Sequence, residues 1–385
     1  MRILLIKMSP VEGLNSSTLR TLAVADGLIR LGHEVDYMTI PISNCHVINK
    51  NTSIIDSLNI VRANHNQLYD SITVSSKKKS SLKSIFIKLL RSIYHKISIY
   101  DYTYNISKNV NIDLLDTKEY DIIISSSDPK SSHVAMRRLI DKGIKYNKWI
   151  QYWGDPLAND ITHKSMYPKW ILRIIEFNLL KTADRIVYVS PFTYKQQVDE
   201  FPKLSKKMMW APIPYIKKKN YVKTLNETYT VGYFGAYKSR VRNINPLYNA
   251  CKKMEGVVHL NIAGDSDIVL EECKNVCIYP RKNVDDLEGN SDLLVCMLNS
   301  SGMQIPGKIY HYAATNKPIL VLLDGENKEE MKEYLESFNR YIICDNNKKE
   351  IEDTINWIIE NPKDYSPCES LNSVSIASEI LNGEI

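Results

Sequence analysis

The 385-residue sequence has no long hydrophobic run and no regular set of cysteines. No stretch approaches the roughly 20 apolar residues of a membrane-spanning helix, and the apolar run in the first ten residues is too short for a signal peptide. The seven cysteines are scattered, and the close pair Cys273 and Cys277 has no second Cys or His pair to complete a zinc site. These absences lead us to expect a cytoplasmic protein with reduced thiols and no structural metal.

Acidic residues are missing from one segment. The net charge is +6, and residues 71–100 contain seven Lys or Arg and no Asp or Glu, which leaves −1 for the remainder. The chain is therefore not a generally basic nucleic-acid binder but has one basic patch. The patch residues are Lys77, Lys78, Lys79, Lys83, Lys88 and Arg91, followed by Lys96.

Apolar residues between Leu82 and Ile97 recur at helical spacing within this basic segment. A basic amphipathic helix with aromatic residues can lie on an anionic membrane surface. The same pattern also fits a helix that packs on its own sheet and exposes a solvated basic face. The sequence leaves both interpretations open.

Strands and helices are expected to alternate along the first half of the chain. Strands are predicted at 2–7, 33–40, 120–125, 148–152 and 183–190. A helix is predicted from about Leu19 to Leu31, with Ser16, Ser17 or Thr18 as its N-cap. Another is predicted at 168–180, with Trp170, Ile171, Ile174, Ile175 and Leu179 facing the core. The first unit lacks Gly-x-Gly-x-x-Gly and therefore the dinucleotide-binding fingerprint.

The second half repeats the pattern, with strands expected at 229–235, 258–263, 276–279, 292–297, 318–323 and 341–344. The proline-punctuated segment 210–214 marks a domain boundary. We predict an N-terminal domain at 1–214, a C-terminal domain at 215–365, and a tail at 366–385 that can pack back on the first. The fold class is α/β, with two Rossmann-like halves and a small-molecule cleft between them.

Polar residues at the ends of predicted strands are candidates for ligand contact. Asp128 and His133 follow the strand at 120–125, and Asp155 follows the strand at 148–152, where open α/β sheets bind ligands. His133 also fits a helix-cap or core histidine. In the second half, Pro306-Gly307-Lys308 begins a predicted helix, whose free N–H groups suit a phosphate, although proline at this position is common for structural reasons.

Four segments resemble GT-B glycosyltransferases, specifically glycosyltransferase family 4 of bacterial surface-polysaccharide clusters. They are RLGHEVDYMTIP, ADRIVYVSPF, GYFGAYKSRVRNINPLYNA and PGKIYHYAATNKPIL, and the resemblance covers nearly the whole chain. It implies two Rossmann-like domains facing across a cleft and a nucleotide-diphosphate sugar donor. It also implies retaining transfer without a metal or other cofactor, with the leaving phosphate often acting as the base.

The resemblance also implies roles for individual residues. The donor diphosphate would be bound by Gly235, Arg240, Arg242, Asn243, Gly307 and Lys308. The acceptor-side loop would include Gly13, Ser16 and Ser17, and the catalytic candidates are Asp128, His133 and Asp155.

The chain departs from the family at the donor ribose. The family usually has glutamates where this sequence has His311 and, eight residues earlier, Met303. A neutral imidazole offers one donor and one acceptor to a hydroxyl group. His311 and Gln304 are therefore the candidates for contacts to the donor ribose and sugar.

The implied reaction is sugar transfer to a lipid-linked or oligosaccharide acceptor in capsule or O-antigen synthesis, with the basic patch on the cytoplasmic membrane face. Two alternatives remain open. A sugar-nucleotide epimerase of the same fold needs carboxylates around the sugar and no membrane patch. A catalytically silent membrane-associated partner would explain the change at His311. Asp265-Ser-Asp267 matches a metal-binding pattern but is expected to form an ordinary turn.

Overall fold

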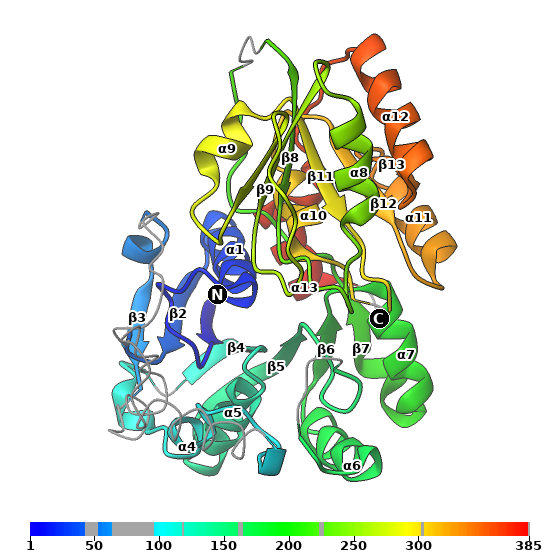
Figure 1. The fold of residues 1–385 in the computed structure, drawn as a ribbon. Coiled ribbons are helices and arrows are strands. Elements are labelled where there is room, and N and C mark those ends of the chain that lie inside the picture. The colour runs from blue at the N-terminus through cyan, green and yellow to red at the C-terminus, as the bar shows by residue number, and fades with distance from the viewer. Residues whose placement is uncertain are drawn as a thin grey trace, which may run out of the picture. The chain divides into compact units, whose positions relative to one another are not determined.

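The computed structural model describes residues 1–42, 53–63, 96–117, 119–160, 165–222, 227–301 and 304–383. The chain forms two compact units (Figure 1). The N-terminal unit consists of Met1–Ile216 together with Ser373–Ile385, and the C-terminal unit is Lys217–Asn372. The chain thus divides after Ile216, whereas the sequence placed the boundary at 214, and the last helix belongs to the first unit.

Within its described residues, the N-terminal unit is built on a seven-stranded sheet in which all neighbours are parallel. The strand order is β3 (Asn59–Arg62), β2 (Glu34–Thr39), β1 (Arg2–Ile6), β4 (Glu119–Ser126), β5 (Lys145–Trp153), β6 (Arg185–Tyr188) and β7 (Met208–Trp210). Almost every residue of β1 and β4 is buried, as expected for central strands of a sheet that is covered on both faces. The carboxyl ends of β1, β4 and β5 therefore meet at one edge.

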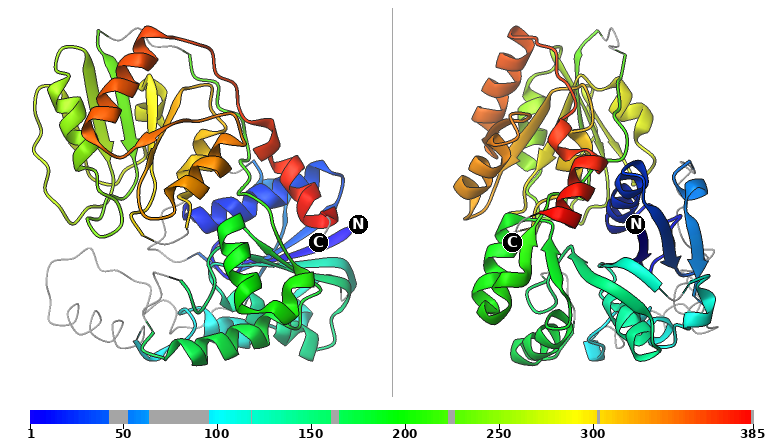
Figure 2. Two further views of the ribbon diagram at one scale, coloured as in Figure 1. Left: turned by 90° about the vertical axis from the view of Figure 1, so that its right-hand side faces the viewer. Right: turned by 180° about the vertical axis from the view of Figure 1, so that it is seen from behind.

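Helices cover this sheet on both faces. They are α1 (Ser16–Arg30), α4 (Tyr104–Lys108), α5 (Ser131–Asp141), α6 (Lys169–Leu180), α7 (Pro191–Glu200) and α13 (Ser373–Asn382), with short 3₁₀ turns at Ile55–Ser57, Ile112–Leu114 and Pro202–Lys207. Helix α13 lies beside α1 (Figure 2). A Cβ on Gly27 of α1 would lie 2.0 Å from the Ser373 carbonyl oxygen, so only glycine permits this close contact.

The C-terminal unit has a six-stranded parallel sheet. Its order is β10 (Val276–Tyr279), β9 (Val258–Ala263), β8 (Tyr229–Phe234), β11 (Leu293–Met297), β12 (Ile319–Leu323) and β13 (Ile342–Asp345). The helices are α8 (Asn245–Lys253), α9 (Asp285–Asn290), α10 (Gly307–Tyr312), α11 (Lys328–Glu336) and α12 (Lys348–Glu360), with a 3₁₀ turn at Glu369–Leu371. Two parallel sheets flanked by helices confirm the predicted α/β class.

Two sequence-based expectations need correction. The N-cap of α1 is Asn15, not one of the residues at 16–18, because its side chain accepts a hydrogen bond from Thr18 N. Trp170 and Ile174 of α6 are exposed rather than buried. The helix is rotated because Glu176 turns inward with Leu172 and bonds to backbone N–H groups.

Helix α10 begins at Gly307, where the sequence predicts it, and has six residues. The basic residues Lys77, Lys78, Lys79, Lys83, Lys88 and Arg91 lie outside the described residues, so the membrane-surface helix and the helix packed on the sheet both stay predictions. Within the part of the chain that is described, no helix is long and apolar enough to span a membrane.

Candidate active site

Charged side chains gather at the carboxyl edge of the N-terminal sheet. Lys7 follows β1, Asp128 follows β4 and Asp155 follows β5, and parallel neighbours bring these strand ends together. Adjacent loops and α1 add the other members. We refer to the set as the N-terminal cluster: Lys7, Arg20, Asp128, Lys130, Asp155 and Asp160.

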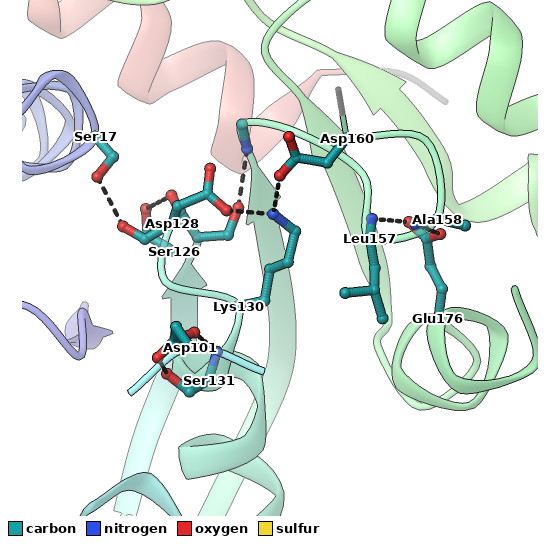
Figure 3. Close-up of polar contacts among 12 residues, drawn as sticks. Ser17, Asp101, Ser126, Asp128, Lys130, Ser131, Leu157, Ala158, Asp160 and Glu176 are labelled. Atoms are coloured by element: carbon teal, nitrogen blue, oxygen red, sulfur yellow. Dashed lines mark hydrogen bonds and ion pairs between the residues drawn. The ribbon is translucent and has the colours of Figure 1, made fainter. Parts of the chain in front are cut away.

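Lys130 binds two carboxylates of this cluster (Figure 3). Its Nζ lies 2.7 Å from Asp128 Oδ1 and 2.9 Å from Asp160 Oδ2. Burial opposes ionisation of Asp128, but Lys130, Arg20 and Lys7 outweigh it and hold the pKa of Asp128 below its usual value. Burial likewise opposes the charge on Lys130, and the two carboxylates still raise its pKa. The group is therefore an ionised bridge at neutral pH.

The backbone around Asp128 is held by a second set of donors. The Asp128 carbonyl oxygen accepts from Lys7 Nζ at 2.6 Å and from Ser17 Oγ at 2.7 Å. Arg20 donates to the Ser127 carbonyl oxygen. The fully buried Lys7 has its pKa lowered well below the usual value by burial and by Arg20. These contacts hold the backbone at Ser127 and Asp128 in place.

Asp155 differs from its neighbours because burial, followed by repulsion from Asp128 and Asp160, raises its pKa to about 7. No hydrogen bond to its carboxylate is found among the described residues. A carboxyl group with this pKa can exchange a proton near neutral pH. Asp155 is thus the carboxyl group of the cluster that can gain or lose a proton near neutral pH.

Glu176 of α6 holds the loop that carries Asp155. Its carboxylate accepts from Leu157 N at 2.8 Å and Ala158 N at 2.9 Å (Figure 3). Burial raises the pKa of Glu176 to about 7, partly offset by these two N–H groups. At Gly154, a Cβ would lie 2.5 Å from the Arg20 guanidinium, so glycine lets α1 approach this loop.

His133 lies behind the cluster in the core. Its ring stacks on Trp153 at 4.3 Å between centroids, and its Nδ1 lies 2.8 Å from Ser125 Oγ. Burial lowers the pKa of His133 to about 3, so the imidazole is neutral. Ser125 also accepts from the Trp149 indole at 2.8 Å. These contacts fit a core histidine packed against β4 and β5.

The structure separates the predicted acceptor-side residues. Ser17 Oγ joins the N-terminal cluster through the Asp128 carbonyl. Ser16 is the exposed first residue of α1, and Gly13 lies in the turn before it, donating to the Pro10 carbonyl at 3.0 Å. Ser17 is therefore the one of the three that touches the cluster directly.

Arg242 links two loops at the carboxyl edge of the C-terminal sheet. Its Nε donates to Asn299 Oδ1 after β11 at 3.0 Å, and its Nη1 donates to the Ala236 carbonyl after β8 at 3.1 Å. Both acceptors are neutral, and no carboxylate pairs with Arg242 among the described residues. The guanidinium charge is thus positioned but not neutralised, as an anion-binding site requires.

The other predicted diphosphate residues on this side surround Arg242. Gly235 follows β8, and a Cβ on Gly264 would lie 2.0 Å from the Gly235 carbonyl, so the ends of β8 and β9 are closely packed. Arg240 is exposed in the same loop. Asn243 stabilises the turn before α8, where its Oδ1 accepts from Asn245 N at 3.3 Å and its carbonyl accepts from Asn346 at 2.9 Å.

Lys308, unlike Arg242, is paired with a carboxylate. Its Nζ lies 2.6 Å from Oε1 of the buried Glu288, which also binds Lys219 at 3.2 Å through Oε2. Burial opposes ionisation of Glu288, but the two lysines lower its pKa. Gly307 begins α10, directly before Lys308. An anion that binds Lys308 must therefore compete with Glu288.

Two further donor candidates lie along the same segment. Burial and the Lys308 charge lower the pKa of His311 to about 4, so it offers a neutral imidazole. The Nε2 of Gln304 is buried and finds no hydrogen-bond partner among the described residues. Both carboxylates of the Asp265-Ser-Asp267 turn have partners elsewhere in the unit, because Asp267 accepts from Ser239 N at 2.7 Å and Asp265 pairs with Arg281 at 3.3 Å.

Sequence reasoning missed several members of these sites. Lys7 could have been found, because a lysine that ends a buried strand is unusual and indicates a polar partner. Glu176 shares its helical phase with Leu172 and Leu179, but Trp170 and Ile174 favour another face, so its inward position could not be found from the sequence. Asp160, Glu288 and Asn299 carry no local signal, because their partners lie 30, 20 and 57 residues away in the sequence. Lys130 could have been found, because its partner Asp128 is two residues away.

Comparison with known proteins gives the fold. No protein-family model matches the chain, and no match was found among curated proteins. Solved structures do match, and HepE from Anabaena in complex with UDP and glucose has a TM-score of 0.55 at 12% identity, covering 100% of this chain and 97% of HepE.

Two other structures agree. TarM from S. aureus, with UDP among its ligands, has a TM-score of 0.54 at 11% identity over 99% of this chain and 96% of its own. The sucrose-phosphate synthase of Thermosynechococcus elongatus has a TM-score of 0.53 at 12% identity over 100% and 94%. Agreement over the whole chain confirms the predicted GT-B fold of two Rossmann-like domains.

Proposed function

We propose that this protein is a glycosyltransferase that uses a nucleotide-diphosphate sugar. The observation that carries the proposal is Arg242, whose uncompensated guanidinium joins the loops after β8 and β11. Similar structures with the same fold hold UDP, which supports a nucleotide in this chain as well.

In this proposal the donor diphosphate binds to Arg242 and Arg240, with Gly235 allowing close approach and Asn243 shaping the loop. Gly307 and Lys308 supply a second contact once Lys308 exchanges Glu288 for phosphate oxygens. His311 and Gln304 bind the ribose or sugar. Fixed cations on the leaving group can replace a metal ion, so we expect a metal-independent reaction without other cofactors.

The N-terminal cluster orients the acceptor in the proposed reaction. The acceptor hydroxyl attacks the anomeric carbon while the bond from that carbon to the diphosphate breaks, and the hydroxyl proton passes to the leaving phosphate. Configuration is retained through an oxocarbenium-like transition state. Asp155 orients the hydroxyl, the Asp128 carboxylate stabilises developing positive charge, and His133 supports the Asp128 loop.

We further propose that the acceptor is a lipid-linked glycan of bacterial surface-polysaccharide synthesis, such as capsule or O-antigen. The basic segment at 71–100 supports a position on the cytoplasmic face of the membrane, because anionic lipids attract such segments. The resemblance to family 4 enzymes supports the polysaccharide role.

A thermal-shift panel tests the donor site. Wild-type protein is mixed with UDP, GDP, CMP, dTDP and their common sugar forms, with and without a chelator. The proposal expects a selective rise in Tm that survives chelation, and the responding base identifies the donor. If no nucleotide raises the Tm, the proposal of a glycosyltransferase fails, and the protein is better explained as a catalytically silent partner.

One observation favours the epimerase as a second candidate. Asp128, Asp155 and Asp160 place three carboxyl groups together, and Asp155 titrates near neutral pH. An epimerase converts the donor sugar without any acceptor. Proton NMR of the selected sugar nucleotide, incubated with enzyme alone, separates the two activities, because a transferase leaves the sugar configuration unchanged.

A further inference from the structure

The outer face of α6 is apolar and open to solvent. Trp170 is 61% exposed and Ile174 is 54% exposed, and residues four apart lie on the same side of a helix. Just before the helix, Met166 is 74% exposed and Tyr167 is 40% exposed. We refer to these four residues, together with Ile97, as the α6 face.

Ile97 extends this face from a distant part of the sequence. Met166 N donates to the Lys96 carbonyl at 2.8 Å, which places residue 97 next to the start of the α6 face. Ile97 is itself 64% exposed. Scattered single apolar residues are normal on a surface, but a contiguous group indicates an interaction site.

The opposite side of α6 already has its partners. Leu179 and Leu180 pack in the core of the N-terminal unit, and Glu176 bonds to the Asp155 loop. Helix α6 lies at the outside of this unit (Figure 1). Packing within the unit therefore does not explain why the outer residues of α6 are apolar.

The segment that carries most of the α6 face contains only basic charged residues. Residues 165–175 contain Lys169 and Arg173 and no acidic residue, and Lys96 is exposed beside Met166. Arg173 is paired with Glu200, so Lys96 and Lys169 are the charges left for a partner. A lysine in the first turn works against the helix dipole, so Lys169 does not serve helix stability.

We infer that the α6 face docks on an anionic lipid surface. Trp and Tyr side chains favour the boundary between headgroups and acyl chains, Met and Ile can enter the apolar layer, and the lysines meet the negative surface. The inference builds on the proposed lipid-linked acceptor and names a described surface for it. It differs from the basic segment at 77–91, which holds few aromatic residues and many charges.

Co-sedimentation of the full chain with vesicles tests this inference. The double variant Trp170→Glu, Ile174→Glu should bind vesicles of phosphatidylglycerol and phosphatidylcholine at least about tenfold more weakly than wild type. Wild type should bind pure phosphatidylcholine weakly. The variant should have the same Tm as wild type, because both side chains are exposed in the free protein.

Trp357→Glu is the matched control, since Trp357 is 49% exposed on the acidic helix α12 of the other unit. This variant should bind vesicles like wild type. Equal vesicle binding by the α6 double variant would overturn the inference. The inference would also be overturned if wild type formed a dimer and bound no vesicles while the double variant was a monomer. The α6 face would then bind a second copy of the chain. The vesicle assay contains no nucleotide, so its outcome does not depend on the result of the thermal-shift experiment with nucleotides.

Discussion

The two units hold their charged residues in opposite ways. In the N-terminal cluster, Lys130 bridges Asp128 and Asp160 at 2.7 and 2.9 Å, and the charges largely neutralise one another. In the C-terminal unit, Arg242 bonds to the neutral oxygens of Asn299 and Ala236. A neutralised cluster can position groups and move a proton, whereas an uncompensated cation can bind an anion. This difference fits the proposed reaction, in which the acceptor binds to the first unit and the donor to the second.

Lys308 combines both patterns. It belongs to the proposed donor side, yet Glu288 neutralises it at 2.6 Å. Lys219 also contacts Glu288, so the carboxylate keeps one cation if Lys308 leaves. Exchange of Lys308 from Glu288 to a diphosphate is therefore electrostatically feasible.

The largest expected effect is on stability in the N-terminal cluster. Lys130→Met leaves Asp128 and Asp160 without their shared cation, and breaking a buried ion pair costs about 3–5 kcal/mol. Urea unfolding measures the loss. Arg138→Met is the control, because the Arg138–Asp141 pair is exposed and such pairs contribute at most about 1 kcal/mol. Similar losses in the two variants would mean that the cluster is not a neutralising bridge.

The next effect concerns donor binding. Arg242→Ala removes a charged hydrogen-bond donor worth roughly 1.5–3 kcal/mol, so UDP affinity measured by calorimetry should fall about tenfold or more. Arg281→Ala, an exposed arginine of the same unit, should leave UDP affinity unchanged. An unaltered affinity in Arg242→Ala would remove the proposed diphosphate contact.

The third effect is a pH dependence of stability. Between the unfolded pKa of about 3.9 and the folded value of about 7, native Asp155 keeps a proton that the unfolded chain has lost. Stability therefore falls as pH rises through this window and levels off above it. In urea unfolding from pH 4 to 8 (about the range set by the two pKa values), Asp155→Asn should show a shallower decline than wild type. Parallel curves would contradict the raised pKa.

The smallest effect tests the Lys308 exchange. Glu288→Gln keeps the shape of the side chain but removes the charge that competes for Lys308, so UDP affinity should rise by about two- to fivefold. Glu352→Gln, which alters the exposed Lys253 pair in the same unit, serves as the control. A loss of affinity in Glu288→Gln would show that Glu288 positions Lys308 rather than competing for it.

Much of the fold could be predicted from local patterns. Apolar runs such as Arg2–Ile6 and Ile319–Leu323 identify buried strands, and the α/β class follows from their alternation with helices. The orientation of α6 could not be predicted, because the apolar residues Trp170 and Ile174 favour the wrong face. Glu176 decides the phase through two backbone N–H groups that the sequence does not reveal.

The candidate site was predictable where a residue ends a strand. Asp128 and Asp155 follow this rule, since parallel strands bring such residues to one edge, whereas Arg242 lies farther along the loop after β8 and was expected from the resemblance. The ion pairs of the site were not predictable. The pair of Lys130 with Asp160 and the pair of Lys308 with Glu288 each join segments that are separated in the sequence. His133 shows the limit of the rule, since it follows the same strand yet packs on Trp153.

The division between donor and acceptor sides is tested most directly by titrating UDP into wild type, Arg242→Ala and Asp155→Asn in the presence of a chelator. We predict that wild type and Asp155→Asn bind UDP equally well and without metal, while Arg242→Ala binds at least about tenfold more weakly. Loss of UDP binding in Asp155→Asn, with binding retained in Arg242→Ala, would contradict the assignment of the donor to the C-terminal unit.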